Sequence, residues 1–155
     1  MSKSMKRVIA ALEAAGLEAD ILEMANETRT AADAAREAEC EIDQIAKSII
    51  FQGMKSGRIF LFITAGGQRV DADKASKLAG EPLGRADASA VRSETGFAIG
   101  GVSPVGHLTA PTAFFDRSLL RFDKIYAAAG TPHHIFPIYS QKLLEISHAQ
   151  LSDFI

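Results

Sequence analysis

The sequence predicts one α+β domain built on a mixed β-sheet with flanking helices. Its 155 residues, 47% apolar and 23% charged, have the size and composition of a single compact domain with a substantial core. Segments with helical periodicity and short aromatic or β-branched runs follow one another irregularly, without the repeating βα units of a doubly wound sheet. We therefore treat residues 1–155 as one domain.

The first predicted helix covers about residues 4–15. Ser4 is a suitable N-cap, and Gly16 stands where a left-handed residue commonly ends a helix. The apolar positions form one stripe, which consists of Val8, Ile9 and Leu12. This spacing gives the helix one face for the core.

A short strand and a second helix are expected next. Residues 19–24 are apolar enough to form a short strand. Thr30 and Asp33 open an alanine-rich run in a pattern similar to a capping box, and this helix should end near Cys40. We expect one further helical turn over residues 42–46.

The middle of the chain predicts a β-hairpin. Residues 48–52 and 59–64 are rich in β-branched and aromatic side chains, and Gly53 and Gly57 mark the connection between them. This content is typical of the central strands of a sheet.

The second half predicts helices over residues 71–78 and 87–95, which Gly80 and Gly96 would close. Residues 97–106 combine several glycines with a proline, so we expect a loop with special backbone geometry. Short strands and a closing helix should follow, at residues 111–115, 124–128, 134–138 and 140–146.

The composition argues against several classes of protein. Cys40 is the single cysteine and cannot form an internal disulfide, and no apolar run approaches the roughly 20 residues that cross a bilayer. The basic N-terminus leads into an amphipathic helix rather than the apolar region of a signal peptide. We expect a soluble, cytoplasmic monomer without a membrane partner.

The charge distribution leaves nucleic-acid binding open. The net charge of -2 disfavours phosphate binding, but residues 8–46 carry ten acidic and two basic side chains, whereas residues 47–142 carry twelve basic and seven acidic ones. One interpretation is a basic face in the second part. The other is two ordinary solvated surfaces.

The loop 97–106 resembles a nucleophile elbow only superficially. The G-x-S-x-G elbow requires glycine where Val105 stands, and its oxyanion hole uses the N–H of the residue after the serine, which here is Pro104 and has none. We therefore expect no serine nucleophile, and Ser103 is either a turn serine or a substrate contact.

Metal and nucleotide signatures are also missing from the sequence. The histidines lack helical i, i+4 pairing and cysteine partners, and neither phosphate-binding glycine motif occurs. We expect no metal and no cofactor. His133 and His134 would point to opposite faces of a strand, so at most one of them can line a pocket.

Lys47 and the glycine-rich loop at residues 97–106, called the glycine loop below, remain as the candidate site. Taken alone, a lysine at the entrance of an apolar strand is typical of an exposed lysine. An ammonium beside converging backbone N–H groups can also stabilise an oxyanion or a phosphate. The residues by themselves do not decide between these interpretations.

Several motifs in order carry a resemblance that covers nearly the whole chain. They are Thr30 with Asp33-Ala34-Ala35, Ile45-Ala46-Lys47-Ser48-Ile49-Ile50-Phe51, strand 59–64 with the Asp71 helix, Thr95-Gly96-Phe97, Gly100 to Gly106, Asp116 with Ser118-Leu119-Leu120, and Ala129-Gly130-Thr131-Pro132. This order resembles the YbaK/EbsC family, whose domain is also inserted in bacterial prolyl-tRNA synthetases. The resemblance implies a mixed, partly barrel-like sheet.

The resemblance also implies an activity and a site. Family members hydrolyse the ester between a wrong small amino acid (alanine, cysteine, serine, threonine or 2-aminobutyrate) and tRNA, most often proline tRNA, and prolyl-tRNA synthetase is an implied partner. The implied catalytic residues are Lys47, Gly100 and Gly101. The implied substrate-binding residues are Ile49, Phe51, Val102, Ser103, Pro104, Gly130 and His133.

Two other functions stay open at this point. One is a non-catalytic module with the same fold that binds tRNA or a synthetase, although the chain retains both Lys47 and the glycine loop. The other is a hydrolase of small free esters or amides, for which tRNA is irrelevant.

Overall fold

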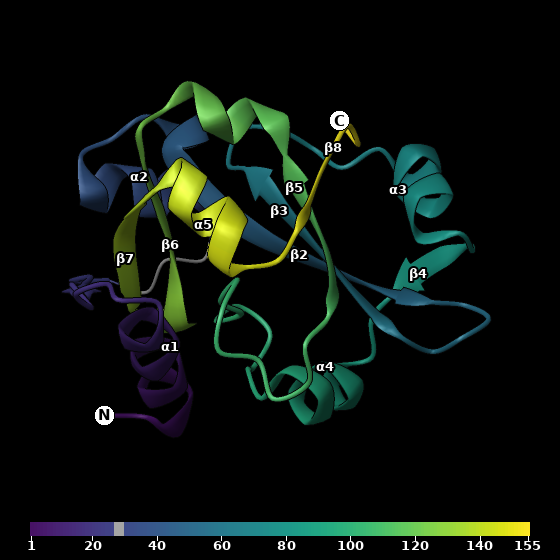
Figure 1. Cartoon of the computed structure of the whole chain (residues 1–155), viewed down its shortest axis with the longest axis horizontal. Coiled ribbons are helices and arrows are strands. Elements are labelled where there is room, and N and C mark those ends of the chain that lie inside the picture. Colours follow the sequence, from purple (N-terminus) through teal and green to yellow (C-terminus); the bar gives the residue numbers. More distant parts are fainter. Residues whose placement is uncertain (27–29) are drawn as a thin grey trace.

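The structure is a computed structural model that describes residues 1–26 and 30–155 (Figure 1). Its α-helices are α1 (Lys3–Ala14), α2 (Ala31–Ala38), α3 (Ala72–Ala79), α4 (Ala88–Thr95) and α5 (Ser140–Ile146), and its 3-10 helices are η1 (Ile42–Gln44) and η2 (Arg117–Arg121). Its strands are β1 (Leu22–Glu23), β2 (Ile45–Gly53), β3 (Ile59–Ala65), β4 (Leu83–Arg85), β5 (Thr112–Asp116), β6 (Lys124–Thr131), β7 (His134–Tyr139) and β8 (Gln150–Ser152).

All of these strands belong to one mixed sheet. Seven of them follow the order β1-β7-β6-β2-β3-β5-β8, and β4 pairs with β2 off this path. The pairs β2–β6, β3–β5 and β5–β8 are parallel, and the other pairs are antiparallel. The predicted α+β class with a mixed sheet and flanking helices is therefore confirmed.

β3 is the centre of the core, since every one of its residues is buried. Successive side chains of β3 point to opposite faces of the sheet and belong to two apolar clusters. Phe60 and Phe62 pack with Phe114 and Phe154 on one side of the sheet. Leu61 and Ile63 belong to the larger cluster on the other side, which α1, α4 and α5 help to form.

The predicted hairpin is confirmed, but its first strand is longer than expected. β2 and β3 pair antiparallel from Ala46–Ala65 to Gln52–Ile59. The expected helical turn over residues 42–46 is wrong beyond η1, because Ile45 and Ala46 pair with β6 instead. Long-range pairing thus overrides the local pattern, and Lys47 lies inside a strand rather than at its entrance.

Other differences also follow from distant contacts. Ser2, not Ser4, caps α1, because the Ser4 hydroxyl donates to the Gly130 carbonyl 126 residues away. Residues 19–24 contribute only the two-residue strand β1. β4 and β8 have three residues each and were not predicted, since strands this short are defined by their neighbours rather than by their own sequence.

The loop over residues 97–106 is held in place by α1. The Arg7 guanidinium donates to the carbonyls of Gly96 (2.6 Å) and Gly106 (3.2 Å), at the two ends of the loop, and lies over the Phe97 ring. The backbone of α1 also touches Gly106 so closely that a Cβ there would lie 3.0 Å from Arg7. The first helix therefore clamps the loop against the sheet.

No helix in the described ranges combines the length and apolar character that a bilayer span requires.

Replacing Arg7 with alanine should lower the free energy of unfolding by about 2 kcal/mol, because two partly buried carbonyls lose a charged donor. Urea denaturation measures this change. Lys6→Ala, one residue earlier on the exposed side of α1, is the matched control and should shift stability by less than about 0.5 kcal/mol. Equal effects of the two substitutions would contradict the clamp.

Candidate functional site

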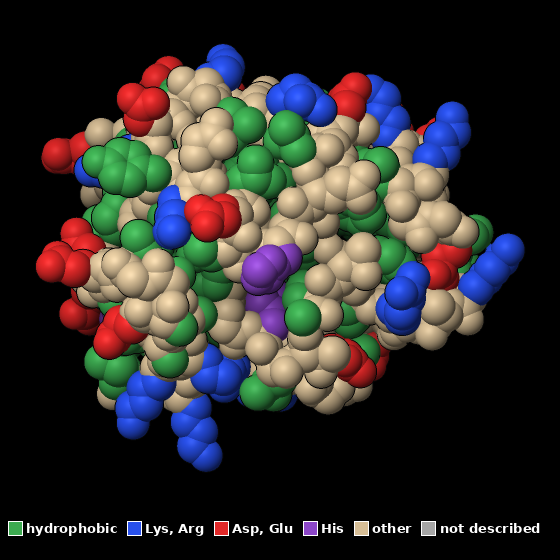
Figure 2. Space-filling view, viewed as in Figure 1, with side chains coloured by type: hydrophobic (Ala, Val, Ile, Leu, Met, Phe, Trp, Pro, Cys, Tyr) green, Lys and Arg blue, Asp and Glu red, His purple; other side chains and the backbone are tan. Residues whose placement is uncertain are grey.

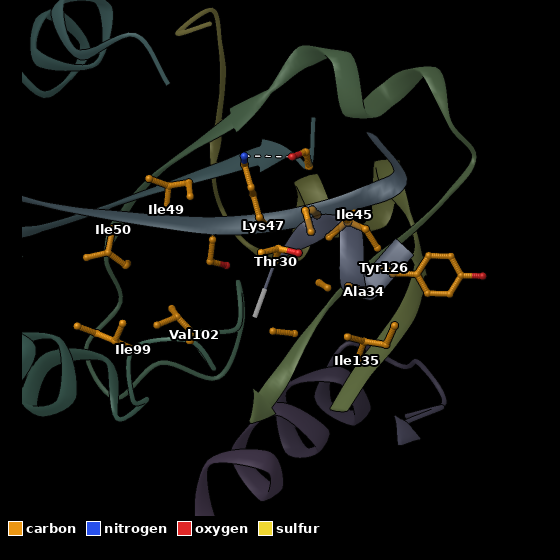
Figure 3. A pocket seen from close by; sticks show the side chains of 18 of the residues that line it. Thr30, Ala34, Ile45, Lys47, Ile49, Ile50, Ile99, Val102, Tyr126 and Ile135 are labelled. Carbon is orange, nitrogen blue, oxygen red and sulfur yellow. Dashed lines mark hydrogen bonds between the residues drawn. The ribbon is translucent and has the colours of Figure 1, made fainter. Parts of the chain in front are cut away.

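A cavity of about 700 Å³ opens beside β2 (Figure 3). α2 and β6 bound one side of it, and the loop at residues 99–102 bounds the other. Figure 3 shows Lys47 and Ile49 on one side of the β2 ribbon and Ile50 on the other, with Ile99 and Val102 facing the strand from the loop. A cavity of this size lies within the range of about 300–1,000 Å³ that small-molecule sites occupy.

The cavity exists because β2 changes its neighbour along its length. On the edge opposite β3, β6 pairs only with Ile45 and Ala46, and β4 pairs only with residues 51–53. No strand of the described chain covers residues 47–50 on that edge. These four residues all line the cavity.

Lys47 is fixed by two backbone carbonyls. Its Nζ donates to the Gly66 oxygen at 3.1 Å and to the Gln68 oxygen at 2.6 Å, both in the turn that follows β3. An ammonium carries three N–H groups, so one of them has no partner among the described residues. The simple exposed-lysine interpretation is therefore wrong, since this side chain is half-buried and hydrogen-bonded.

Two carboxylates hold the same turn from behind. The buried Asp116 carboxylate accepts from the Ala65 N–H at 3.0 Å, and the Asp43 carboxylate accepts from the Gly67 N–H at 2.8 Å. Gly66 packs tightly against η1, because a Cβ there would lie 2.3 Å from the Ile42 carbonyl oxygen. The carbonyls that receive Lys47 are thus rigidly placed.

The pKa of Lys47 is shifted by this environment. Partial burial lowers it from the ordinary value of 10.5, and the nearby Arg69 guanidinium lowers it further. The carboxylates of Asp43 and Asp116 act in the opposite direction and raise it. An ammonium that is partly desolvated interacts more strongly with a ligand's negative charge than one in bulk water.

Gly100 and Gly101 play different parts in the loop. Gly100 is exposed, lines the cavity and has φ 94°, a conformation that favours glycine, and its N–H has no partner among the described residues. Gly101 is buried, and its N–H donates to the Ala98 oxygen at 3.0 Å. A Cβ at Gly101 would lie 3.1 Å from Thr131 Cα, so this glycine lets the loop approach β6.

Ser103 and Pro104 lie behind the cavity rather than in it. Both are buried, and neither lines the cavity. The Ser103 hydroxyl accepts from the Val105 N–H, and its carbonyl meets His107 Nε2 at 2.6 Å. These bonds are those of a turn serine.

The remaining predicted residues divide in the same way. Ile49 and Val102 line the cavity with Lys47 and Gly100. Phe51 points into the apolar cluster beside Phe62, at 5.6 Å between ring centroids, and is absent from the lining.

Gly130 and His133 also lie apart from the cavity. Gly130 packs against α1, where a Cβ would meet the Ser4 backbone at 2.9 Å. His133 is exposed in the turn between β6 and β7. Neither residue lines the cavity.

Several lining residues were not singled out from the sequence as site residues. Ser48 and Ile50 lie on the open edge of β2. The exposed side chains of Arg85 and Ile99 also line the cavity, as does Thr30, which caps α2. Thr30, Ser48 and Ile50 stand in motifs that carry the family resemblance, and Ile99 precedes Gly100, but Arg85 had no sequence signal. In the described ranges, no group of three or more His, Cys, Asp or Glu side chains is arranged to hold a metal ion.

Comparison with known proteins gives a consistent picture. The model of the aminoacyl-tRNA editing domain family matches residues 25–146. The uncharacterised protein YwhH of Bacillus subtilis (strain 168) is 28% identical over 134 residues, which is 86% of this chain and 85% of YwhH.

Solved structures agree over almost the full length. A crystal structure described as a proposed trans-editing enzyme for prolyl-tRNA synthetase is 42% identical with a TM-score of 0.90, covering 99% of this chain and 98% of that one. A scaffold from epitope grafting by computational design is 41% identical, with a TM-score of 0.91 and the same coverage. The hypothetical protein APE2540 is 29% identical, with a TM-score of 0.86 over 96% and 98% of the two chains.

A titration of Lys47 followed by NMR at its ε-carbon should give a midpoint below 10.5, because burial penalises the charged form. Since the unfolded chain then binds more protons, stability should rise with pH between the folded midpoint and 10.5. Comparing the pH dependence of unfolding for wild type and Lys47→Met isolates this contribution. A midpoint at or above 10.5 would be inconsistent with the described surroundings.

Proposed function

The chain belongs to the aminoacyl-tRNA editing domain family, and from this premise we propose that it is a trans-editing deacylase. It hydrolyses the ester between a mischarged small amino acid and the terminal ribose of tRNA, most often proline tRNA. The observation that carries the proposal is the fixed, partly desolvated ammonium of Lys47 beside a cavity of about 700 Å³.

The proposed chemistry needs no covalent nucleophile. An aminoacyl ester is already activated, so positioning of a water and stabilisation of the developing negative charge are sufficient. Lys47 offers its third N–H to the ester or to the adjacent phosphate. Gly100, whose N–H has no partner among the described residues, lines the same cavity from the loop. Ser103 takes no direct part, because it is fully buried and does not line the cavity.

The preference for a small amino acid fits the need for editing. A synthetase pocket shaped for proline cannot strongly exclude residues of equal or smaller volume, so a second site must remove them. The cavity is lined by many alanines and by Ile49, Ile50 and Val102. The chain is 42% identical in sequence to a proposed trans-editing enzyme for prolyl-tRNA synthetase and has a similar structure, which supports proline tRNA as the substrate.

Cations at the mouth provide sites for the tRNA backbone. Arg85 lines the cavity and is exposed, and Arg69 lies within electrostatic reach of Lys47. On the face drawn in Figure 2, by contrast, lysines and arginines are scattered among acidic side chains. We therefore propose that tRNA binding is local, centred on the acceptor end, and that contact with prolyl-tRNA synthetase supplements it.

One observation favours a second candidate, a binding module without turnover. Both fixed hydrogen bonds of Lys47 go to its own chain, so the residue also has a structural task. A non-catalytic protein could keep it for that reason alone. The assay described next separates the two functions.

Lys47→Ala should lower kcat/KM for alanyl-tRNA(Pro) by about 100-fold or more, as expected for the loss of a preorganised charge donor. The measurement is release of radiolabelled amino acid from tRNA mischarged with alanine, cysteine, serine or 2-aminobutyrate.

Lys55→Ala, at an exposed lysine of the hairpin connection, is the matched control and should keep wild-type activity. Thermal unfolding of Lys47→Ala shows whether the turn has lost stability. A folded Lys47→Ala protein with the wild-type rate would refute the assignment. Wild-type protein without turnover on all four substrates would favour the binding module.

Arg85→Ala should raise KM for mischarged tRNA by roughly 3- to 10-fold at about 0.1 M salt and leave kcat nearly unchanged, because it removes one phosphate contact outside the reacting centre. The slope of log KM against log salt concentration should also decrease by about one, because one phosphate contact fewer is made. Arg92→Ala, an exposed arginine of α4 that does not line the cavity, serves as the comparison. Identical KM values for both variants would count against a phosphate contact at Arg85.

A further inference from the structure

The open edge of β2 presents a complete pair of backbone hydrogen-bonding groups. In an antiparallel pair, alternate residues turn both their N–H and C=O toward the partner strand. Gly53 N–H donates to the Arg58 oxygen, so the backbone groups of Gly53 point toward the β3 side. Because the direction alternates along the strand, those of Lys47, six residues earlier, point the same way. Ser48 and Ile50 therefore turn their backbone groups away from β3 and toward the cavity.

Ser48 has no strand partner on that side. The ladder with β6 ends at the Ala46–Ala127 pair, and the ladder with β4 ends at Phe51–Arg85. Neither backbone group of Ser48 takes part in these ladders or in a turn or loop hydrogen bond. Its hydroxyl is buried and also has no partner among the described residues. Unpaired polar groups gathered in one place are costly unless a ligand or water satisfies them.

An aminoacyl ester has one set of donors and one acceptor that could pair with the free N–H and C=O of Ser48. It is a single residue with N–H donors on its α-ammonium and one carbonyl acceptor, and in an extended conformation it can form one hydrogen-bonded pair of an antiparallel ladder. We propose that the substrate's aminoacyl group binds β2 at Ser48 in this way. The Ser48 C=O accepts from the α-ammonium, and the Ser48 N–H donates to the ester carbonyl. This inference rests on the proposed function.

The pairing gives Ser48 a part in the reaction. Water adds to the ester carbonyl, the negative charge develops on the oxygen that the Ser48 N–H contacts, and the bond to the ribose oxygen then breaks as that oxygen takes a proton originating from the water. The products are the free amino acid and tRNA with its ribose hydroxyl restored. The Ser48 N–H is thus an oxyanion donor, across the cavity from the loop.

The same geometry directs the amino-acid side chain. Directly opposed residues of an antiparallel pair place their side chains on the same face of the sheet. The side chain of an L-amino acid therefore points to the Ser48 and Ile50 face, toward Val102 and away from the face of Lys47. Backbone recognition would bind any amino acid alike, and the walls of this face would select by size.

The decisive experiment removes one backbone N–H. Replacing residue 48 by the α-hydroxy analogue of serine turns its amide into an ester and leaves the side chain unchanged. Deacylation of alanyl-tRNA(Pro) should slow by about 100-fold. The same exchange at Ala110, an exposed residue that does not line the cavity, is the matched control and should change the rate by less than about 3-fold. Equal losses at both positions, or no loss at 48, would overturn the proposal.

A binding measurement separates this proposal from the proposed function. The probe is 3′-alanylamino-3′-deoxyadenosine, a stable amide analogue of the substrate terminus, titrated into the isotopically labelled wild-type protein. We expect the Ser48 amide resonance to shift more strongly than that of Ile50. Shifts that bypass Ser48 would overturn edge binding even if the wild-type enzyme deacylates tRNA. A shift at Ser48 in a protein without turnover would support binding at this edge and contradict only the proposed deacylase function.

Discussion

The divided pairing of β2 is the constraint on which the site depends. A strand at the centre of a sheet normally has both edges occupied, but here β6 and β4 each cover only one end of the same edge. Between them, Ser48 and Ile50 turn their polar backbone groups toward the wall of a cavity, whereas Lys47 and Ile49 turn theirs toward β3. Because the opposite edge is fully paired with the buried strand β3, this opening is rigid rather than frayed.

The turn after β3 converts that opening into a charged site. Asp116 and Asp43 fix its N–H groups from one side, and its carbonyls fix the Lys47 ammonium from the other. Lys47 therefore holds its position before any substrate arrives, which is the condition for electrostatic preorganisation. The same bonds give the residue a structural role, and the two roles need not conflict, since one N–H remains for a ligand.

The second wall of the cavity depends on a segment far away in sequence. Arg7 of α1 ties both ends of the glycine loop, and Ser4 reaches the end of β6. Gly101 then allows the loop to lie against Thr131, which brings Gly100 and Val102 to face β2. The helix thus sets the width of the cavity without lining it.

The sequence by itself determined what local signals encode. Capping residues and left-handed glycines gave the helices, β-branched runs gave the hairpin, and the order of motifs indicated the family and drew attention to Lys47 and Gly100. It could not separate lining residues from neighbours such as Phe51 and Ser103, because alternation along a strand and burial behind a loop depend on which segments pack against them. The short strands β4 and β8 and the open edge at Ser48 were decided by the tertiary structure alone, since a backbone group is paired or unpaired only through a partner distant in sequence.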